Sequence, residues 1–350
     1  MALNETDTAG KGKERLLFAV LAIVVVLFFI LDLFLGSVNI SPSDVFHALF
    51  SNAHGISETI IEKFRLPKAI TALTVGIALS VSGLQMQTVF RNPMAGPYVL
   101  GLSSGASLGV AFVILGFSSN LSPESIRGLG NWAIAVASWT GAGAIMIIIM
   151  IISARVRSIM TVLIIGIMLA SGISAIVSIL QYFSSETMLK AYVIWTMGSL
   201  GNLTSSQLSV LVLSVAAGTI VCIFSVKMLN ALLLGENYAR SVGLNVRFSR
   251  FVIIAGTSIL AGTVTAFCGP IGFIGIAVPH LARLVFRTAD HRILIPATIL
   301  LGAIIMLASD IISQMPGSDN ILPVNSVTSL IGIPVVIWVL FRNRKYSEIF

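Results

Sequence analysis

Long apolar stretches separated by short polar breaks dominate this sequence. The stretches run for about 17 to 25 residues, the length that an α-helix needs to cross roughly 30 Å of hydrocarbon, and they lack the short alternation of barrel strands. The pattern predicts an all-α integral membrane protein with about ten transmembrane helices. Their expected limits are 16–36, 66–90, 96–117, 131–153, 159–183, 206–226, 251–268, 271–287, 293–313 and 323–341.

Composition supports this interpretation. Of the 350 residues, 56% are hydrophobic and only 10% are charged, whereas a soluble domain carries about 25% charged residues. No linker, low-complexity tract or soluble domain interrupts the pattern, so we expect one transmembrane domain over residues 1–350, with 1–15 as a cytoplasmic tail. Cys222 and Cys268 fall inside predicted spans and are expected to be core residues, not a disulfide pair.

Lysine and arginine are distributed unevenly between the two predicted sides. With the N-terminus in the cytoplasm, 16 of the 21 basic residues fall inside, a clear positive-inside bias. Both termini are then cytoplasmic, which requires an even number of spans. The net charge of +7 follows from this topology and calls for no nucleic-acid partner. The five basic residues on the outer side are Lys63, Arg65, Lys68, Arg127 and Lys190.

The segment 91–109, RNPMAGPYVLGLSSGASLG, concentrates poor helix formers at membrane depth, with Pro93, Pro97 and four glycines. Such residues are tolerated there only where protein or water satisfies the freed backbone groups. Glycines recur every fourth residue from 101 to 109, which favours close packing against another helix. A broken helix that lines a transport pathway is the alternative interpretation.

Catalytic signatures are scarce. GLSSG matches the G-x-S-x-G nucleophile motif, but that motif needs a preceding strand and a partnered base. An intramembrane serine protease using Ser103 or Ser104 with His280 is therefore a remote alternative. The sequence has no phosphate-binding loop, no H-E-x-x-H and no metal-spaced Cys/His cluster, so we expect no catalytic residue and no metal site in this chain.

Ionisable residues within the predicted spans are also few. Asp32 and Asp310 are expected to lie at membrane interfaces and not at the midplane. Proton- or sodium-driven carriers usually need ionisable groups at midplane, so this scarcity argues against a secondary transporter.

The loop between the sixth and seventh spans, residues 227–250, is longer than a simple connection requires. MLNALLL predicts one short apolar helix and 236–242 a second, with Arg240 four residues after Glu236 and Gly243 as a C-terminal cap. Two short helices joined by Gly235 predict a rigid cytoplasmic knob. It could rest on the membrane interface or dock a soluble partner.

On the outer side, Lys63, Arg65 and Lys68 precede or begin the second span. They could extend toward the membrane surface as isolated interfacial cations, or bind acidic residues of an external partner.

Four blocks, in the segments 65–109, 232–246, 269–286 and 290–313, together resemble the FecCD-type permeases of binding-protein-dependent ABC importers, which carry iron-siderophores, haem or vitamin B12. The resemblance implies type II ABC importer architecture in a bacterial cytoplasmic membrane. The subunit would pair with a second permease copy as a homodimer, or with a close homologue. Two ATP-binding subunits would bind inside and a substrate-binding protein outside, and ATP and Mg would bind the partner ATPase.

The resemblance also implies roles for particular residues. The segment 229–244 corresponds to coupling helices, Arg65 and Lys68 to basic positions that face the binding protein, and 92–109 to a pathway-near segment that shifts during alternating access. The implied ATPase-coupling residues are Leu233, Gly235, Glu236, Ala239, Arg240 and Gly243. The implied pathway and packing residues are Asn92, Pro93, Pro97, Gly101, Gly105 and Gly109.

The sequence departs from the family pattern at two places. The family often has an arginine after an Ala-Asp pair that follows the ninth span, whereas this chain reads SDIISQMPGSDN, with Gln314 nearby and no arginine. This weakens the expectation of a basic docking residue there. Asn325 replaces a glycine in the LP-x-G block and is expected to alter an outer loop. An iron chelate is the expected substrate, and cobalamin is the alternative.

Overall fold

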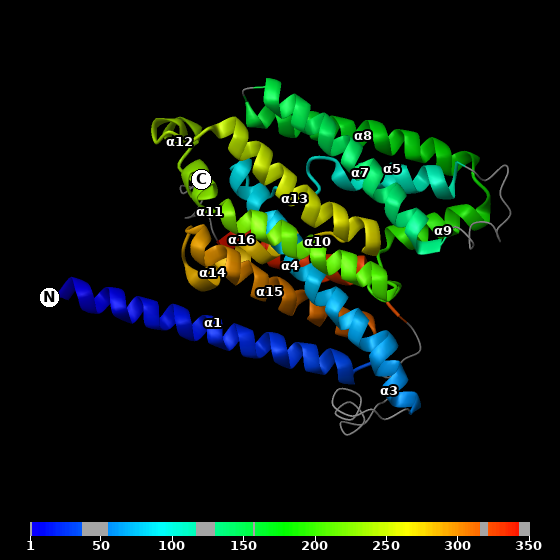
Figure 1. Cartoon of the computed structure of the whole chain (residues 1–350), viewed down its shortest axis with the longest axis horizontal. Helices are drawn as coiled ribbons and strands as arrows, with labels where there is room; N and C mark the ends of the chain where they lie inside the picture. The colour runs from blue at the N-terminus through cyan, green and yellow to red at the C-terminus, as the bar shows by residue number, and fades with distance from the viewer. Residues whose placement is uncertain (1, 37–54, 117–129, 157, 316–320, 343–350) are drawn as a thin grey trace.

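The computed structural model describes every residue except 1, 37–54, 117–129, 157, 316–320 and 343–350. The part of the chain that it describes is helical and contains no β-strand. Most of the long helices run roughly along the long axis of the molecule (Figure 1). The expected all-α class is therefore confirmed.

Seven described helices are long and apolar enough to cross a membrane. Each one covers most of a predicted span, because a long apolar run favours a continuous helix, and α15 continues through Pro296. They are α1 (Ala2–Phe34), α4 (Leu66–Val89), α7 (Gly130–Arg155), α8 (Ile159–Phe183), α10 (Ser205–Phe224), α13 (Val246–Cys268) and α15 (His291–Ser313).

Three shorter apolar helices occupy the remaining predicted spans: α5 (Leu102–Ile114), α14 (Ile274–Phe286) and α16 (Val324–Arg342). The expectation of a helix over 96–117 was wrong in extent. Gly101 has φ +81°, and the helix begins only after it. The 13 residues of α5 rise about 20 Å, less than a bilayer core, so non-helical backbone makes up the rest of this segment.

The structure contains helices that the hydrophobic pattern did not predict. They are α3 (Ile56–Ile60), the π-helix η1 (Ile61–Arg65), which leads directly into α4, and α9 (Glu186–Thr196). All are too short for the pattern of a full span. The predicted tail 1–15 is continuous with the first span, since α1 already begins at Ala2.

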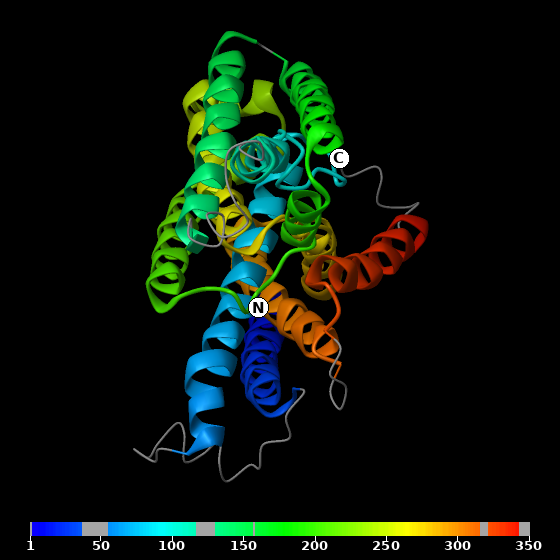
Figure 2. The same ribbon diagram turned by 90° about the vertical axis from the view of Figure 1, so that its right-hand side faces the viewer.

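Burial separates central from peripheral helices. Within the most apolar window of each helix, 83% of α4 and 72% of α13 is buried, against 11% of α1 and 22% of α8. In Figure 2, α16 (red) and α1 (dark blue) lie on the outside of the bundle. The apolar surfaces of α1 and α8 are therefore available for lipid or for another chain.

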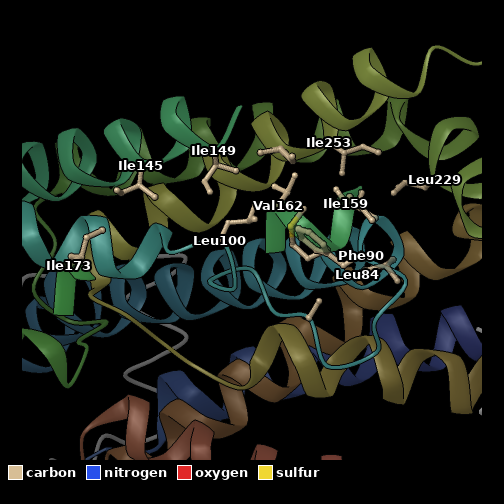
Figure 3. Packing of buried hydrophobic residues seen from close by; sticks show 14 of the residues in the cluster. Leu84, Phe90, Leu100, Ile145, Ile149, Ile159, Val162, Ile173, Leu229 and Ile253 are labelled. Atoms are coloured by element: carbon tan, nitrogen blue, oxygen red, sulfur yellow. The ribbon is translucent and has the colours of Figure 1, made fainter. Parts of the chain in front are cut away.

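One large apolar core joins α4, α7, α8 and α13 (Figure 3). Leu84 and Phe90 come from the end of α4, Ile149 from α7 and Ile253 from α13, and all are almost completely buried. Leu229, from the short helix α11 described below, is buried in the same core. The base of the loop between α10 and α13 is thus packed into the bundle.

Candidate functional site

The loop between α10 and α13 forms two short helices, α11 (Val226–Leu233) and α12 (Glu236–Ser241), which lie at the same end of the molecule as the start of α1 (Figure 1). Gly235 joins them with φ +110°, a conformation that side-chain-bearing residues rarely adopt. Gly243 follows with φ +85°, and its N–H donates to the Arg240 carbonyl at 3.0 Å. The predicted helix, glycine, helix and glycine cap are confirmed, and we call residues 226–243 the knob.

Electrostatic contacts fix the knob to the transmembrane bundle. The carboxylate of Glu236 pairs with Arg240 at 3.5 Å and also with Arg250 of α13. Arg250 is buried, with only 4% of its side chain exposed, whereas 58% of Arg240 is exposed. The i,i+4 pair was predictable from spacing, but the pair with Arg250 is a tertiary contact that no local pattern indicates.

The knob presents an apolar surface that the sequence analysis missed. Leu234, Tyr238 and Val242 are about half exposed or more, at 61%, 47% and 56%. Tyr238 and Val242 are four residues apart on α12 and its C-cap, which was the available signal, whereas Leu234 precedes the turn at Gly235. We call these three residues the knob face. By contrast, Ala239 is completely buried and supports the knob from beneath, and Leu233 is half-buried.

A cavity of about 550 Å³ lies beside the knob, between it and the beginning of α13. Its charged lining consists of Arg240, Arg247 and Arg250, and Val156 also lines it. Glu236 is the acid paired with two of these arginines. Arg247 and the largely exposed Arg240 are the guanidinium groups of this lining that acidic groups of a partner can reach.

The segment that connects α4 to α5 has irregular backbone held by protein groups. Arg91 has φ +47°. Asn92 Oδ1 accepts from the Met94 N–H at 2.9 Å, and His280 Nε2 lies 2.9 Å from the Pro93 carbonyl oxygen. Pro97 packs against Gly275 at the beginning of α14. The expectation that protein shields this backbone is confirmed.

The glycine face of α5 packs against α7. A Cβ on Gly109 would overlap the Ala137 carbonyl oxygen, and one on Gly105 would lie 2.6 Å from the Gly141 carbonyl oxygen. Gly101 lies outside the helix, at its N-cap, next to α8. Close helix packing, the simpler of the two interpretations, is therefore confirmed for Gly105 and Gly109. A role for this segment in a pathway stays a prediction.

Arg65 and Lys68, the implied docking cations, both contact other groups of the same chain. Arg65 is buried and donates from Nη1 to the carbonyl oxygens of Leu33 and Phe34, each at 2.8 Å. Lys68 Nζ lies 3.0 Å from Asp310 Oδ1. Lys63 is exposed.

Asp32 and Asp310 lie near the ends of α1 and α15 and are buried between helices, at 2% and 1% exposed. Their expected place at membrane interfaces stays a prediction. Gln314 Nε2 donates to Asp32 Oδ1 at 3.0 Å and to Asp310 Oδ2 at 3.1 Å. Together with Lys68, these residues form what we call the outer cluster. Burying two carboxylates is tolerated because an ammonium and an amide satisfy them.

The family pattern suggested that Asn325 alters an outer loop, but the residue does not lie in a loop. It is the second residue of α16, and its Oδ1 accepts from the Gly272 N–H at 2.9 Å. The side chain therefore ties α16 to the turn before α14, a contact that glycine could not make.

The serine candidates lack the surroundings of a hydrolase. Ser103 and Ser104 lie in the first turn of α5, after irregular backbone and not after a strand. Nε2 of His280 is occupied by the Pro93 carbonyl. Within the described residues, no hydrogen bond connects His280 to either serine.

Comparisons with known proteins agree with this architecture. The vitamin B12 import system permease protein BtuC of Escherichia coli O9:H4 is 35% identical over 326 residues, covering 93% of this chain and 94% of that protein. An ABC transporter permease protein of Methanocaldococcus jannaschii is 34% identical, covering 89% and 91%. The solved structure of an ABC transporter described as metal-chelate type, in an inward-facing conformation, superimposes with a TM-score of 0.81 at 27% identity, covering 93% and 99%.

A more distant likeness concerns the fold alone. The structure of PsaBC from Streptococcus pneumoniae in complex with Fab aligns with a TM-score of 0.51 at 16% identity. The family model of the FecCD transport family matches residues 23–342, nearly the whole chain and including the knob, the segment 91–109 and the outer cluster. The chain belongs to the FecCD transport family.

Proposed function

We propose that this chain is the permease subunit of an ABC importer that moves a large metal chelate across a bacterial cytoplasmic membrane. ATP, with Mg, is hydrolysed in separate partner subunits. The observation that carries the proposal is the knob: two short helices, rigidly joined to the bundle through Glu236 and Arg250, that present an apolar face beside an arginine-lined cavity. A membrane protein needs no such structure merely to connect two spans.

The proposed topology has ten spans with both termini in the cytoplasm. Seven helices and three shorter apolar helices support this count. The knob then faces the cytoplasm and the outer cluster faces the binding protein. Two ATPase subunits would dock on the knobs of two permease copies, and lipid would cover the remaining apolar surface.

A second copy of this chain is the proposed permease partner. The exposed apolar side chains of α8 offer a surface for it. These residues include Ile164, Ile167, Met168, Ile176 and Ile179.

On the outer side, we propose that the binding protein docks near the start of α4. Lys63 is exposed in this conformation, whereas Lys68 is paired with Asp310. Acidic residues of a binding protein would compete with Asp310 for Lys68, and Arg65 would support the site from within. Engagement would therefore separate Lys68 from the buried Asp310, and contacts with the binding protein would have to offset the cost of leaving that carboxylate unpaired.

For the substrate, an iron chelate such as a siderophore or haem is the first candidate, and cobalamin is the second. The B12 permease relatives favour cobalamin, and the likeness to a metal-chelate type transporter favours the wider class. The test is uptake of radiolabelled iron-siderophore, haem and cobalamin by cells with and without this chain. Loss of one activity on deletion identifies the substrate, and unchanged uptake of all three contradicts the proposal.

The intramembrane protease is tested separately by replacing Ser103 and Ser104 together with alanine. Each serine is only half-buried on α5, so small substitutions there should change stability by no more than about 0.5 kcal/mol. Uptake should be retained. A protein that folds normally but loses all activity would instead favour the hydrolase.

A further inference from the structure

Within the described residues, a chain of hydrogen bonds, partly buried at Asn230 and fully buried between His291 and Thr88, connects the knob to the end of α4. Asn230 of α11 donates from Nδ2 to Asp290 Oδ1 at 2.6 Å, and its Oδ1 accepts from the His291 backbone N–H at 3.0 Å. The His291 ring continues the chain, with Nδ1 2.7 Å from Asn230 Oδ1 and Nε2 2.8 Å from Thr88 Oγ1. His291 and Thr88 are both completely buried.

These contacts determine the protonation of the His291 ring. Asn230 Oδ1 must be the amide oxygen, because a backbone N–H donates to it while Nδ2 faces a carboxylate. Nδ1 of His291 therefore carries a hydrogen and donates to Asn230. In the neutral ring, Nε2 is then an acceptor and needs a donor, which Thr88 supplies.

Thr88 has a single hydroxyl hydrogen and two acceptors for it. Its Oγ1 lies 2.9 Å from the Leu84 carbonyl oxygen within α4, as well as 2.8 Å from His291 Nε2. The hydroxyl can thus bond within its own helix or across to His291. When the hydroxyl bonds within α4, the buried Nε2 of His291 loses its donor, so the bond across to His291 is the favoured one and couples Thr88 to the ring.

The position of Thr88 gives this contact its importance. It lies next to the last residue of α4, immediately before the irregular segment that begins at Arg91. The knob touches that segment directly as well, since a Cβ on Gly235 would lie 3.5 Å from Arg91 Nη1. Nearby, Arg283 Nη1 donates to Gln87 Oε1 at 2.6 Å and ties α14 to the same turn of α4.

We propose that Asn230, His291 and Thr88 form a relay that transmits displacement of the knob to the cytoplasmic end of α4 and the segment 91–101. The inference rests on the proposed function and deepens it, because it names the residues through which ATPase docking acts on the transport segment. His291 and Thr88 are positioning residues. The signal travels through the side-chain bonds as α11 moves relative to α15.

The matched variants are Thr88→Val, which removes the hydroxyl at nearly constant shape, and Thr88→Ser, which keeps it. Purified complexes of this chain with its ATPase subunits and binding protein are reconstituted, and substrate transported per ATP hydrolysed is measured. Thr88→Val should lower this ratio about fivefold or more while ATP hydrolysis continues, and Thr88→Ser should restore it. A Thr88→Val ratio equal to wild type, or a Thr88→Ser ratio as low as that of Thr88→Val, overturns the relay.

A double variant shows whether the residues act in series. Asn230→Leu combined with Thr88→Val should be no worse than the more affected single variant, because both break one chain of contacts. Losses that multiply overturn the relay. Melting temperatures of all variants show whether folding is affected, and a defect in folding alone would lower protein yield without changing the ratio for the folded complex.

The ring of His291 provides a measurement that is independent of transport. The chain has four histidines, and the ¹⁵N NMR signals of the His291 ring are the ones that disappear in the His291→Gln variant. The Nδ1-protonated form is expected, and the Nε2-protonated form overturns the relay. If the wild-type complex moves none of the three candidate substrates, the proposed function fails and the relay with it. If the wild-type complex transports normally and Thr88→Val gives the same ratio of transport to ATP hydrolysis, the relay is overturned and the proposed function stands.

Discussion

Lys68 and Asp310 form an ion pair at the predicted outer side of the bundle, with Lys68 Nζ 3.0 Å from Asp310 Oδ1. Asp310 is 1% exposed, so its charge depends on this partner and on Gln314. The pair joins the beginning of α4 to the end of α15. The same lysine is the proposed contact for a binding protein, which makes its substitution informative for both stability and docking.

Replacing Lys68 with methionine should destabilise the protein by about 3–5 kcal/mol, because it leaves a buried carboxylate without its counter-ion. The double variant Lys68→Met with Asp310→Asn should recover most of that loss. Thermal unfolding in detergent measures both. Lys63→Met, at an exposed position five residues earlier, is the matched control and should change stability little. Equal effects of Lys63→Met and Lys68→Met would contradict the importance of the pair.

The knob face predicts where an ATPase subunit binds. Tyr238→Ser should reduce retention of that subunit strongly, since a central aromatic residue at an interface commonly contributes about 2 kcal/mol or more. Tyr182, 83% exposed at the end of α8, supplies a control of the same chemistry. Co-purification of the ATPase with each variant is the measurement. Loss with Tyr182→Ser but not with Tyr238→Ser would place the interface elsewhere.

Glycine substitutions should separate close packing from helix propensity. A Cβ on Gly109 meets the backbone of α7, so Gly109→Ala should cost about 1–3 kcal/mol. Gly143, on α7 itself, has open space around it, and Gly143→Ala should be neutral or stabilise by up to about 1 kcal/mol. Melting temperatures of the two variants test this contrast, and a tolerated Gly109→Ala would show that α5 and α7 can move apart.

The Asp290 carboxylate predicts a pH effect on stability at the start of α15. Burial raises its pKa, but hydrogen bonds from the Arg292 backbone and from Asn230 outweigh burial and hold the pKa below its usual value. The folded state then gains stability at pH values above the ordinary carboxyl pKa of about 4, and loses it as the pH falls through the lower folded value. Asp290→Asn should flatten this acidic loss in melting temperature measured against pH. An unchanged acidic slope would contradict the assignment.

Much of the fold could be predicted because membrane helices are encoded by local hydrophobicity. The limits expected for the fifth span, 159–183, coincide with α8, and those of the fourth and sixth are within two residues of α7 and α10. The third span was predicted too long, since hydropathy measures apolarity and ignores the conformation that Pro97 and Gly101 impose. The short helices α3 and α9 carry too few residues for a periodic signal.

The candidate site divides in the same way. The two helices of the knob and its glycines follow from local sequence, and so does the pair of Glu236 with Arg240. The bond from Glu236 to Arg250, the outer cluster and the contacts of His291 join residues that only the tertiary structure brings together. Asp310 shows the reason: its place near the end of a span follows from the sequence, but its partners Lys68 and Gln314 are known only from the structure.

ATP-dependent accumulation in sealed proteoliposomes tests the importer assignment most directly. The vesicles contain this chain, its ATPase subunits and the binding protein, and labelled iron-siderophore, haem or cobalamin is followed with ATP or with a non-hydrolysable analogue. We expect one of these chelates to accumulate with ATP only, and not when the knob carries Tyr238→Ser. Accumulation that is independent of ATP, or no accumulation of any chelate by a complex that hydrolyses ATP, would contradict the assignment.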